Sequence, residues 1–176
     1  MDRPEDTDDW AGGFYELAVD LGDSNPARLE DALRALRECA GMTPSQPITA
    51  SAIGRHIRGM TSLAGGQRIV CGTWSVQLPE RDHASFYLPL GALARIDPRV
   101  GGYPFEPNAT GSLTWRRPLD AWLRQLAERV FAVVPFVRGA IGFEADDALE
   151  AGVSDDRWCS LLIPEDGALS FRAATR

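Results

Sequence analysis

The sequence predicts an α+β fold of the ferredoxin-like (split βαβ) type. In this fold an antiparallel sheet has two main helices on one face, and here a C-terminal β-hairpin would either extend the sheet or cover part of it. Three observations support the prediction: an alternating strand pattern near the start, two amphipathic helical patterns well separated along the chain, and shorter alternating runs between and after them. Right-handed crossovers would fold the first six elements, in the order β-α-β-β-α-β, into one sheet.

The first strand and the first helix have clear local signals. Apolar and polar side chains alternate over residues 15–21, which is the period of a half-buried strand. A helix is predicted for residues 26–40, because Asn25 can cap its start and Pro26 fits the first helical position. Gly41 can end the helix. Its apolar stripe consists of Leu29, Leu33, Leu36 and Ala40.

The remaining elements follow from shorter patterns. Strands are predicted at 67–78, 85–90 and 139–145, the second main helix at 115–135, and the closing hairpin at 158–173. The second helix has the strongest pattern, because apolar residues recur at spacings of three and four until a proline ends the run. The stretches 42–66 and 97–113 are rich in turn-forming residues, and both are predicted as long connections.

Pro89 stands inside the most strand-like run of the chain, at residues 85–90. A proline has no N–H group for the hydrogen-bond ladder, so its strand should lie at an edge of the sheet or end at the proline. We expect the edge position, where a proline prevents pairing with another chain.

The composition is typical of one globular domain. The chain has 176 residues, of which 44% are hydrophobic and 24% charged, and this is enough to build one core. We expect residues 11–176 to form a single α+β domain and the acidic residues 1–10 to form a flexible tail. The sequence has neither an N-terminal apolar segment nor an apolar run of about 18 residues, so a cytoplasmic protein is expected.

The charge balance excludes several partners. The chain has 25 acidic and 18 basic residues, and its net charge is -7. This negative field disfavours nucleic acid and anionic membranes, and it favours a basic protein as the partner. All the basic residues are arginines, so mechanisms that need a lysine, such as a Schiff base or a P-loop, are excluded. Exclusive use of arginine is typical of GC-rich bacterial genomes.

No catalytic or metal-binding pattern is present in the sequence. The three cysteines are far apart, and they are predicted to be free, buried thiols without a metal or cofactor. Residues 80–85 contain acid, base and nucleophile types, but a solvated hairpin turn is the expected structure there. Glu16 and Asp20 share one strand face about 13 Å apart, too far for a pair of catalytic carboxyls, and are expected to face solvent. An enzyme is therefore not the favoured prediction.

Two groups of basic residues are candidate binding sites. Arg116 and Arg117 are predicted at the start of the second main helix, where free backbone N–H groups can bind an anion. Replacing both is expected to leave the fold stable. Arg55, His56 and Arg58 form the most basic local patch, and they could hold a phosphate or a carboxylate. The plainer interpretation of both groups is a solvated surface whose charge is balanced by nearby acidic residues.

Two loop aromatics and an acidic segment complete the candidates. Tyr103 and Phe105 lie in the second long connection, where they either pack into the core or contact a partner. The segment 146–156 is acidic and would attract a basic partner.

Three functions remain open at this point. In size, acidity and α+β pattern the chain resembles small bacterial proteins that neutralise a partner, such as toxin-immunity proteins. This resemblance implies a cytoplasmic protein-binding domain of the immunity or regulatory kind. The alternative is a protein or enzyme that binds a small anionic ligand through Arg116 and Arg117. A subunit of a larger assembly is the third interpretation, and it predicts an exposed apolar patch on the sheet face away from the helices.

Overall fold

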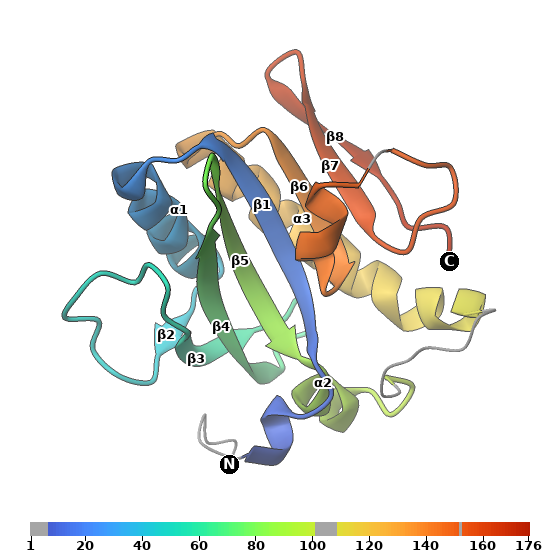
Figure 1. Cartoon of the computed structure of the whole chain (residues 1–176). Coiled ribbons are helices and arrows are strands. Elements are labelled where there is room, and N and C mark those ends of the chain that lie inside the picture. Colours follow the sequence, from blue (N-terminus) through green and yellow to red (C-terminus); the bar gives the residue numbers. More distant parts are fainter. Residues whose placement is uncertain (1–6, 101–108, 152) are drawn as a thin grey trace.

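The computed structural model describes residues 7–100, 109–151 and 153–176. The strands in these residues are β1 (Phe14–Asp23), β2 (Thr43–Pro44), β3 (Ile57–Ser62), β4 (Arg68–Gln77), β5 (Arg81–Pro89), β6 (Arg138–Phe143), β7 (Ser160–Glu165) and β8 (Ala168–Arg172). The helices are α1 (Pro26–Cys39), α2 (Leu90–Ile96) and α3 (Leu113–Val133), with the 3-10 helices η1 (Thr7–Trp10), η2 (Ala109–Ser112) and η3 (Ala145–Leu149). The strands form one antiparallel sheet in the order β2-β3-β4-β5-β1-β6-β7-β8, and α1 and α3 lie on one face of it (Figure 1).

The prediction of a ferredoxin-like sheet with two helices is wrong. The sheet has eight strands, and the described residues contain three α-helices. Two of the strands, β2 and β3, lie in the stretch 42–66, which the sequence pattern predicts as a connection. The pattern of β3 is weak because Gly59 and Thr61, rather than large apolar residues, occupy buried positions. Glycine is required at position 59, since a Cβ there would lie 2.3 Å from the Thr43 carbonyl oxygen.

Pro89 is the last residue of β5, and it precedes α2 directly. The expectation of an edge strand is wrong, because β5 lies between β4 and β1 in the interior of the sheet. The other expectation, that the strand ends at the proline, is confirmed. The backbone N–H of Leu90 donates to the Gly13 carbonyl oxygen at 3.0 Å as the chain leaves the sheet for α2. The missing N–H of the proline therefore coincides with the end of the ladder.

The main core lies between the sheet and the helices. The odd-numbered residues of β1 from Tyr15 to Leu21 are fully buried on this side, and they pack with the predicted apolar stripe of α1. The helix α1 begins as predicted, and the Asn25 side chain accepts a hydrogen bond from the Arg28 backbone N–H at 3.1 Å. Four residues of α3 complete this layer: Trp122, Leu123, Leu126 and Val130. The positions of β1, of both main helices and of the closing hairpin are thus confirmed.

The last four residues of the predicted flexible tail belong to the folded domain. They form η1, which packs against α2. Asp9 is buried there, and one of its carboxylate oxygens lies 2.9 Å from the Arg95 guanidinium. Close packing of the two segments depends on Gly91, where a Cβ would lie 2.4 Å from the Asp8 carbonyl oxygen. A buried ion pair with α2 therefore orders a segment whose acidic composition predicts a flexible tail.

Candidate functional site

The face of the sheet away from α1 and α3, here called the open face, is turned towards the viewer in Figure 1. The short helix η3 crosses it over β1 and β6, whereas the middle of β4 and β5 has no described helix over it on this side. The antiparallel register sets three rows of neighbours on this face: Glu16, Tyr87 and Gly72; Ala18, Ser85 and Trp74; and Asp20, His83 and Val76.

Aromatic side chains gather on the open face around Tyr87. The ring of Tyr87 is buried and contacts the rings of Phe14, His56 and Trp10 at centroid distances of 4.6, 5.8 and 6.1 Å. Its hydroxyl lies 3.0 Å from Nδ1 of His56. Together with Arg58 and Trp74, these residues form what we call the aromatic face: Trp10, Phe14, His56, Arg58, Trp74 and Tyr87.

The outer layer of the aromatic face is accessible. The ring of His56 stacks on Trp74 with a centroid distance of 5.4 Å and an interplanar angle of 7°. The guanidinium carbon of Arg58 lies 4.3 Å from the centre of the Trp10 ring, which is a cation–π contact. His56 and Arg58 are exposed, and both tryptophans are half-buried. The buried Tyr87 ring thus supports an outer layer of two tryptophans, a histidine and an arginine.

The position of Tyr87 depends on a glycine in the neighbouring strand. A Cβ at Gly72 would lie 2.4 Å from both Cζ and the hydroxyl oxygen of Tyr87. We expect Gly72→Ala to lower the free energy of unfolding by about 1–3 kcal/mol, because the ring must move and its contacts are lost. Urea denaturation measures this change. Gly111→Ala is the control, since a Cβ there meets no atom within 4 Å. Equal stability of the two variants would contradict the prediction.

Glu16 lies buried beneath the aromatic face, with an exposed fraction of 3%. The side chains of Trp74 and Ser85 donate hydrogen bonds to its carboxylate, and the Asp146 backbone N–H donates to Oε1 at 3.3 Å. Burial raises the pKa of Glu16 to about 8, and the negative charge of Asp146 contributes to the increase. Glu16 is therefore mostly protonated at neutral pH. The expectation that Glu16 faces solvent is wrong, because η3 folds over it.

Asp20 is also buried, and the same expectation is wrong for it. One of its carboxylate oxygens lies 2.9 Å from the Arg81 guanidinium, and the other lies 4.0 Å from Nε2 of the buried His83. The predicted solvated turn at 80–85 is wrong as well, because β5 begins at Arg81 and several of its first residues are buried. The hydroxyl of Ser85 bonds to Glu16 beneath Trp74, so it is not placed for attack on a substrate.

The structure brings Arg55, His56 and Arg58 together around a pocket of about 180 Å³ next to β3. Residues 45–48 form the other wall of this pocket. Two of the three predicted residues, His56 and Arg58, also belong to the aromatic face. The basic patch of the sequence is thus concave and continuous with the aromatic face.

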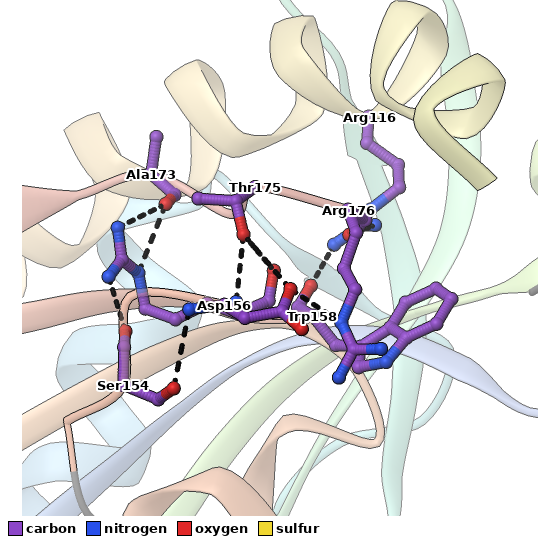
Figure 2. A network of polar contacts seen from close by, with 8 residues as sticks. Arg116, Ser154, Asp156, Trp158, Ala173, Thr175 and Arg176 are labelled. Atoms are coloured by element: carbon purple, nitrogen blue, oxygen red, sulfur yellow. Dashed lines mark hydrogen bonds and ion pairs between the residues drawn. The ribbon is translucent and has the colours of Figure 1, made fainter. Parts of the chain in front are cut away.

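The other predicted arginines do not converge on a site. Arg116 is buried, with an exposed fraction of 2%, and its guanidinium is used within the chain. It donates to the Arg176 carbonyl oxygen at 2.7 Å and to the Trp158 carbonyl oxygen, as Figure 2 shows. Arg117, the next residue, is exposed. The helix itself begins three residues before Arg116, so neither arginine lies at its first position. Tyr103 and Phe105 lie outside the described residues.

Arg116 is part of a buried polar network below the sheet. Its Nε lies 3.3 Å from the Tyr15 hydroxyl, and this hydroxyl donates to Asp120. Ser160 donates to the other carboxylate oxygen of Asp120 at 2.6 Å. Burial raises the pKa of Asp120, although the hydrogen bonds from Ser160 and Tyr15 oppose the increase. The network joins β1, α3, β7 and the C-terminal residues, which is a structural role.

The cysteines are free thiols. Burial raises the pKa of Cys71 and Cys159 to about 12, so both thiols are protonated at neutral pH and are weak nucleophiles. Among the described residues, no group of three His, Cys, Asp or Glu side chains could hold a metal ion. The described part of the chain also has no helix that is both long and apolar enough to cross a membrane.

Sequence reasoning missed most of the aromatic face. The signal in the sequence was the spacing in β4, where Gly72 and Trp74 lie two residues apart and therefore on the same face, with Gly72 paired to Tyr87. No family model matches the sequence, and comparisons with curated proteins and with solved structures give no significant match. Functional inference for this chain therefore rests on its own residues.

Proposed function

We propose that this protein is a protein-binding domain that recognises its partner through the aromatic face. The observation that supports this most directly is the accessible layer in which Arg58 lies over Trp10 and His56 stacks on Trp74. Tryptophan, tyrosine and arginine dominate the energetics of protein interfaces. The buried Tyr87 and the strands of the sheet hold this layer in place, so binding costs little side-chain ordering.

The charge of the surrounding surface supports a basic partner. Glu144, Asp147 and Glu150 are exposed on and beside η3, which lies on the same face of the sheet. The net charge of -7 would attract a basic protein from a distance and speed its association. Within this proposal the protein is an immunity-like or regulatory protein of the cytoplasm.

The alternative, a small anionic ligand, has less support from the described residues. Two pockets lined by described residues have volumes of about 180 and 220 Å³, whereas sites for small organic ligands commonly span roughly 300–1,000 Å³. Arg116, the residue on which the alternative of an anionic ligand depends, is occupied by backbone carbonyl groups of its own chain.

Affinity capture from the source organism tests the proposal. We expect the wild type to retain a partner that the double variant His56→Ala/Arg58→Ala loses. The dissociation constant of the double variant should be at least tenfold higher, because these side chains are expected to contribute about 1.4 kcal/mol or more to the binding free energy. Arg117→Ala on the other side of the molecule removes one positive charge as well, and it should bind like the wild type. Capture should weaken at high salt, because steering by charge is screened. A partner retained equally by all three proteins, or no partner at all, would refute the proposal.

A further inference from the structure

We infer that the pocket beside β3 binds a carboxylate group from a short acidic segment of a protein partner that is basic overall. This inference rests on the proposed function, since the partner supplies the segment. The pocket, here called the β3 pocket, is formed by residues 45–48 and 55–58 and has a volume of about 180 Å³. At roughly 30 Å³ of liquid volume per water molecule, it has room for a carboxylate on a short side chain.

Among the described residues, the positive charges of the β3 pocket have no carboxylate partner. In the described part of the chain, no carboxylate oxygen lies within 4 Å of the Arg55 or Arg58 guanidinium. Within these residues, the Arg55 guanidinium donates to the Ser51 carbonyl oxygen at 3.3 Å, and the Arg58 guanidinium lies over the Trp10 ring. Other arginines of the chain do have carboxylate partners, as in Arg34–Asp31, Arg81–Asp20 and Arg99–Asp97. Two arginines that line a pocket and have no carboxylate partner among the described residues present a complementary surface to a carboxylate.

The walls of the β3 pocket are held in place by hydrogen bonds. The backbone N–H and the hydroxyl of Ser45 both donate to the Arg58 carbonyl oxygen, at 2.9 and 3.0 Å. Before β3, the Gly54 backbone N–H donates to the Ser75 hydroxyl at 3.0 Å, and the Ala52 backbone N–H donates to Glu30 at 2.8 Å. The pocket is therefore formed before a ligand arrives, which lowers the cost of binding.

A carboxylate fits the donors of the pocket better than a phosphate. Phosphate sites are commonly built from the N-terminus of a helix or from a run of backbone N–H groups. No helix begins in residues 45–48 or 55–58. Two guanidinium groups instead suit a single carboxylate, which each of them can bind through paired N–H groups.

His56 reports the occupancy of the pocket. Its surroundings are Arg58 from β3, Trp74 from β4 and Tyr87 from β5. Partial burial lowers the pKa of His56, and the positive charge of Arg58 lowers it further. A bound carboxylate would offset that charge and raise the pKa. The chain has two histidines, and the second, His83, is buried elsewhere on the face, so it serves as an internal control.

Histidine ring-proton NMR tests the inference with a defined probe. The probe is a blocked tetrapeptide with one aspartate and one glutamate, compared with its asparagine and glutamine counterpart. We expect the acidic peptide to raise the pKa of His56 by about half a unit at saturation and to leave His83 unchanged. The neutral peptide should change neither signal. Absence of an effect of the acidic peptide on His56 would overturn the inference.

Variants and a phosphate control complete the test. Arg55→Gln/Arg58→Gln should abolish the effect of the acidic peptide, whereas Arg117→Gln should retain it. A larger effect from inorganic phosphate than from the peptide at the same concentration would overturn the assignment to a carboxylate. The two proposals fail separately. If the peptide has no effect but partner capture still depends on His56 and Arg58, the pocket inference fails and the protein-binding function stands; the opposite pair of results refutes the function.

Discussion

Glu16→Gln is expected to stabilise the protein at alkaline pH relative to the wild type. In the folded chain the pKa of Glu16 is about 8, whereas the ordinary value is 4.5. Between these two values the unfolded chain has lost its proton from this group and the folded chain has kept it. Folding therefore requires proton uptake, and the wild type loses stability as the pH rises through this window. Below it, the carboxyl is protonated in both states and contributes no pH dependence.

The expected size of this effect is large because the carboxyl is buried and no cation among the described residues compensates its charge. A difference of one unit between the pKa values of the folded and unfolded chains corresponds to about 1.4 kcal/mol. Across the full pH window the free energy of unfolding therefore changes by about 3–5 kcal/mol. Glutamine keeps the size of the side chain and an oxygen that can accept from the Asp146 N–H, but it cannot ionise. The free energy of unfolding is measured with urea at pH 5 and at pH 8.5. Its decrease between these two pH values should be about 3–5 kcal/mol larger in the wild type than in Glu16→Gln.

A matched substitution separates this effect from general titration of the chain. Glu128 is an exposed residue of α3 that pairs with Arg124 at 2.9 Å. Glu128→Gln should follow the pH dependence of the wild type, because exposed ion pairs contribute little. Parallel pH profiles for the wild type and Glu16→Gln would show that the buried carboxyl is not the source. Lower amide-exchange protection factors in η3 at high pH, in the wild type but not in Glu16→Gln, are a second expected result, since a charged Glu16 would repel Asp146.

The outcome for Glu16 shows why a strand pattern predicts the core more reliably than the opposite face. In β1 the odd-numbered residues have the expected apolar character, and they pack against the helices. The even-numbered residues are predicted to face solvent, because no nearby residues in the sequence indicate a segment that packs over this face. That cover is η3, whose Asp146 lies 130 residues further along the chain. Because η3 is so distant in sequence, the alternation of apolar and polar residues in β1 does not indicate that η3 buries Glu16.

The strand β4 shows a second limit of sequence reasoning. Both of its faces contain apolar residues, with Ile69 and Cys71 on the core side and Val70 and Trp74 on the open side. The spacing of apolar residues in β4 therefore does not predict which of its faces packs against the helices. The register with β5 decides it, because Thr73 pairs with the core residue Phe86. The basic patch at residues 55–58 was predictable because its residues are neighbours in sequence, whereas the aromatic face combines residues from η1, β1, β4 and β5 with those at the start of β3.

The largest loss of stability is expected from Arg116→Met. This change removes the donor to the partly buried carbonyl oxygens of Trp158 and Arg176 (Figure 2). It also removes the positive charge that lowers the pKa of Asp120. Breaking a buried polar network from one side typically costs about 3–5 kcal/mol, so we expect a loss of that order in urea denaturation. The sequence-based expectation that Arg116 can be replaced without loss of stability is therefore not supported by its burial.

Two further variants make the Arg116 prediction specific. Arg117→Met changes the exposed neighbour and should alter the free energy of unfolding by no more than about 0.5 kcal/mol. Arg116→Met/Asp120→Asn should lose less than the sum of the two single variants, because the double variant leaves no uncompensated carboxylate. If Arg116→Met and Arg117→Met are equally stable, the network does not hold the C-terminal strands to α3. Strictly additive losses would show instead that Arg116 acts through the backbone carbonyls alone and that Asp120 is balanced by Tyr15 and Ser160.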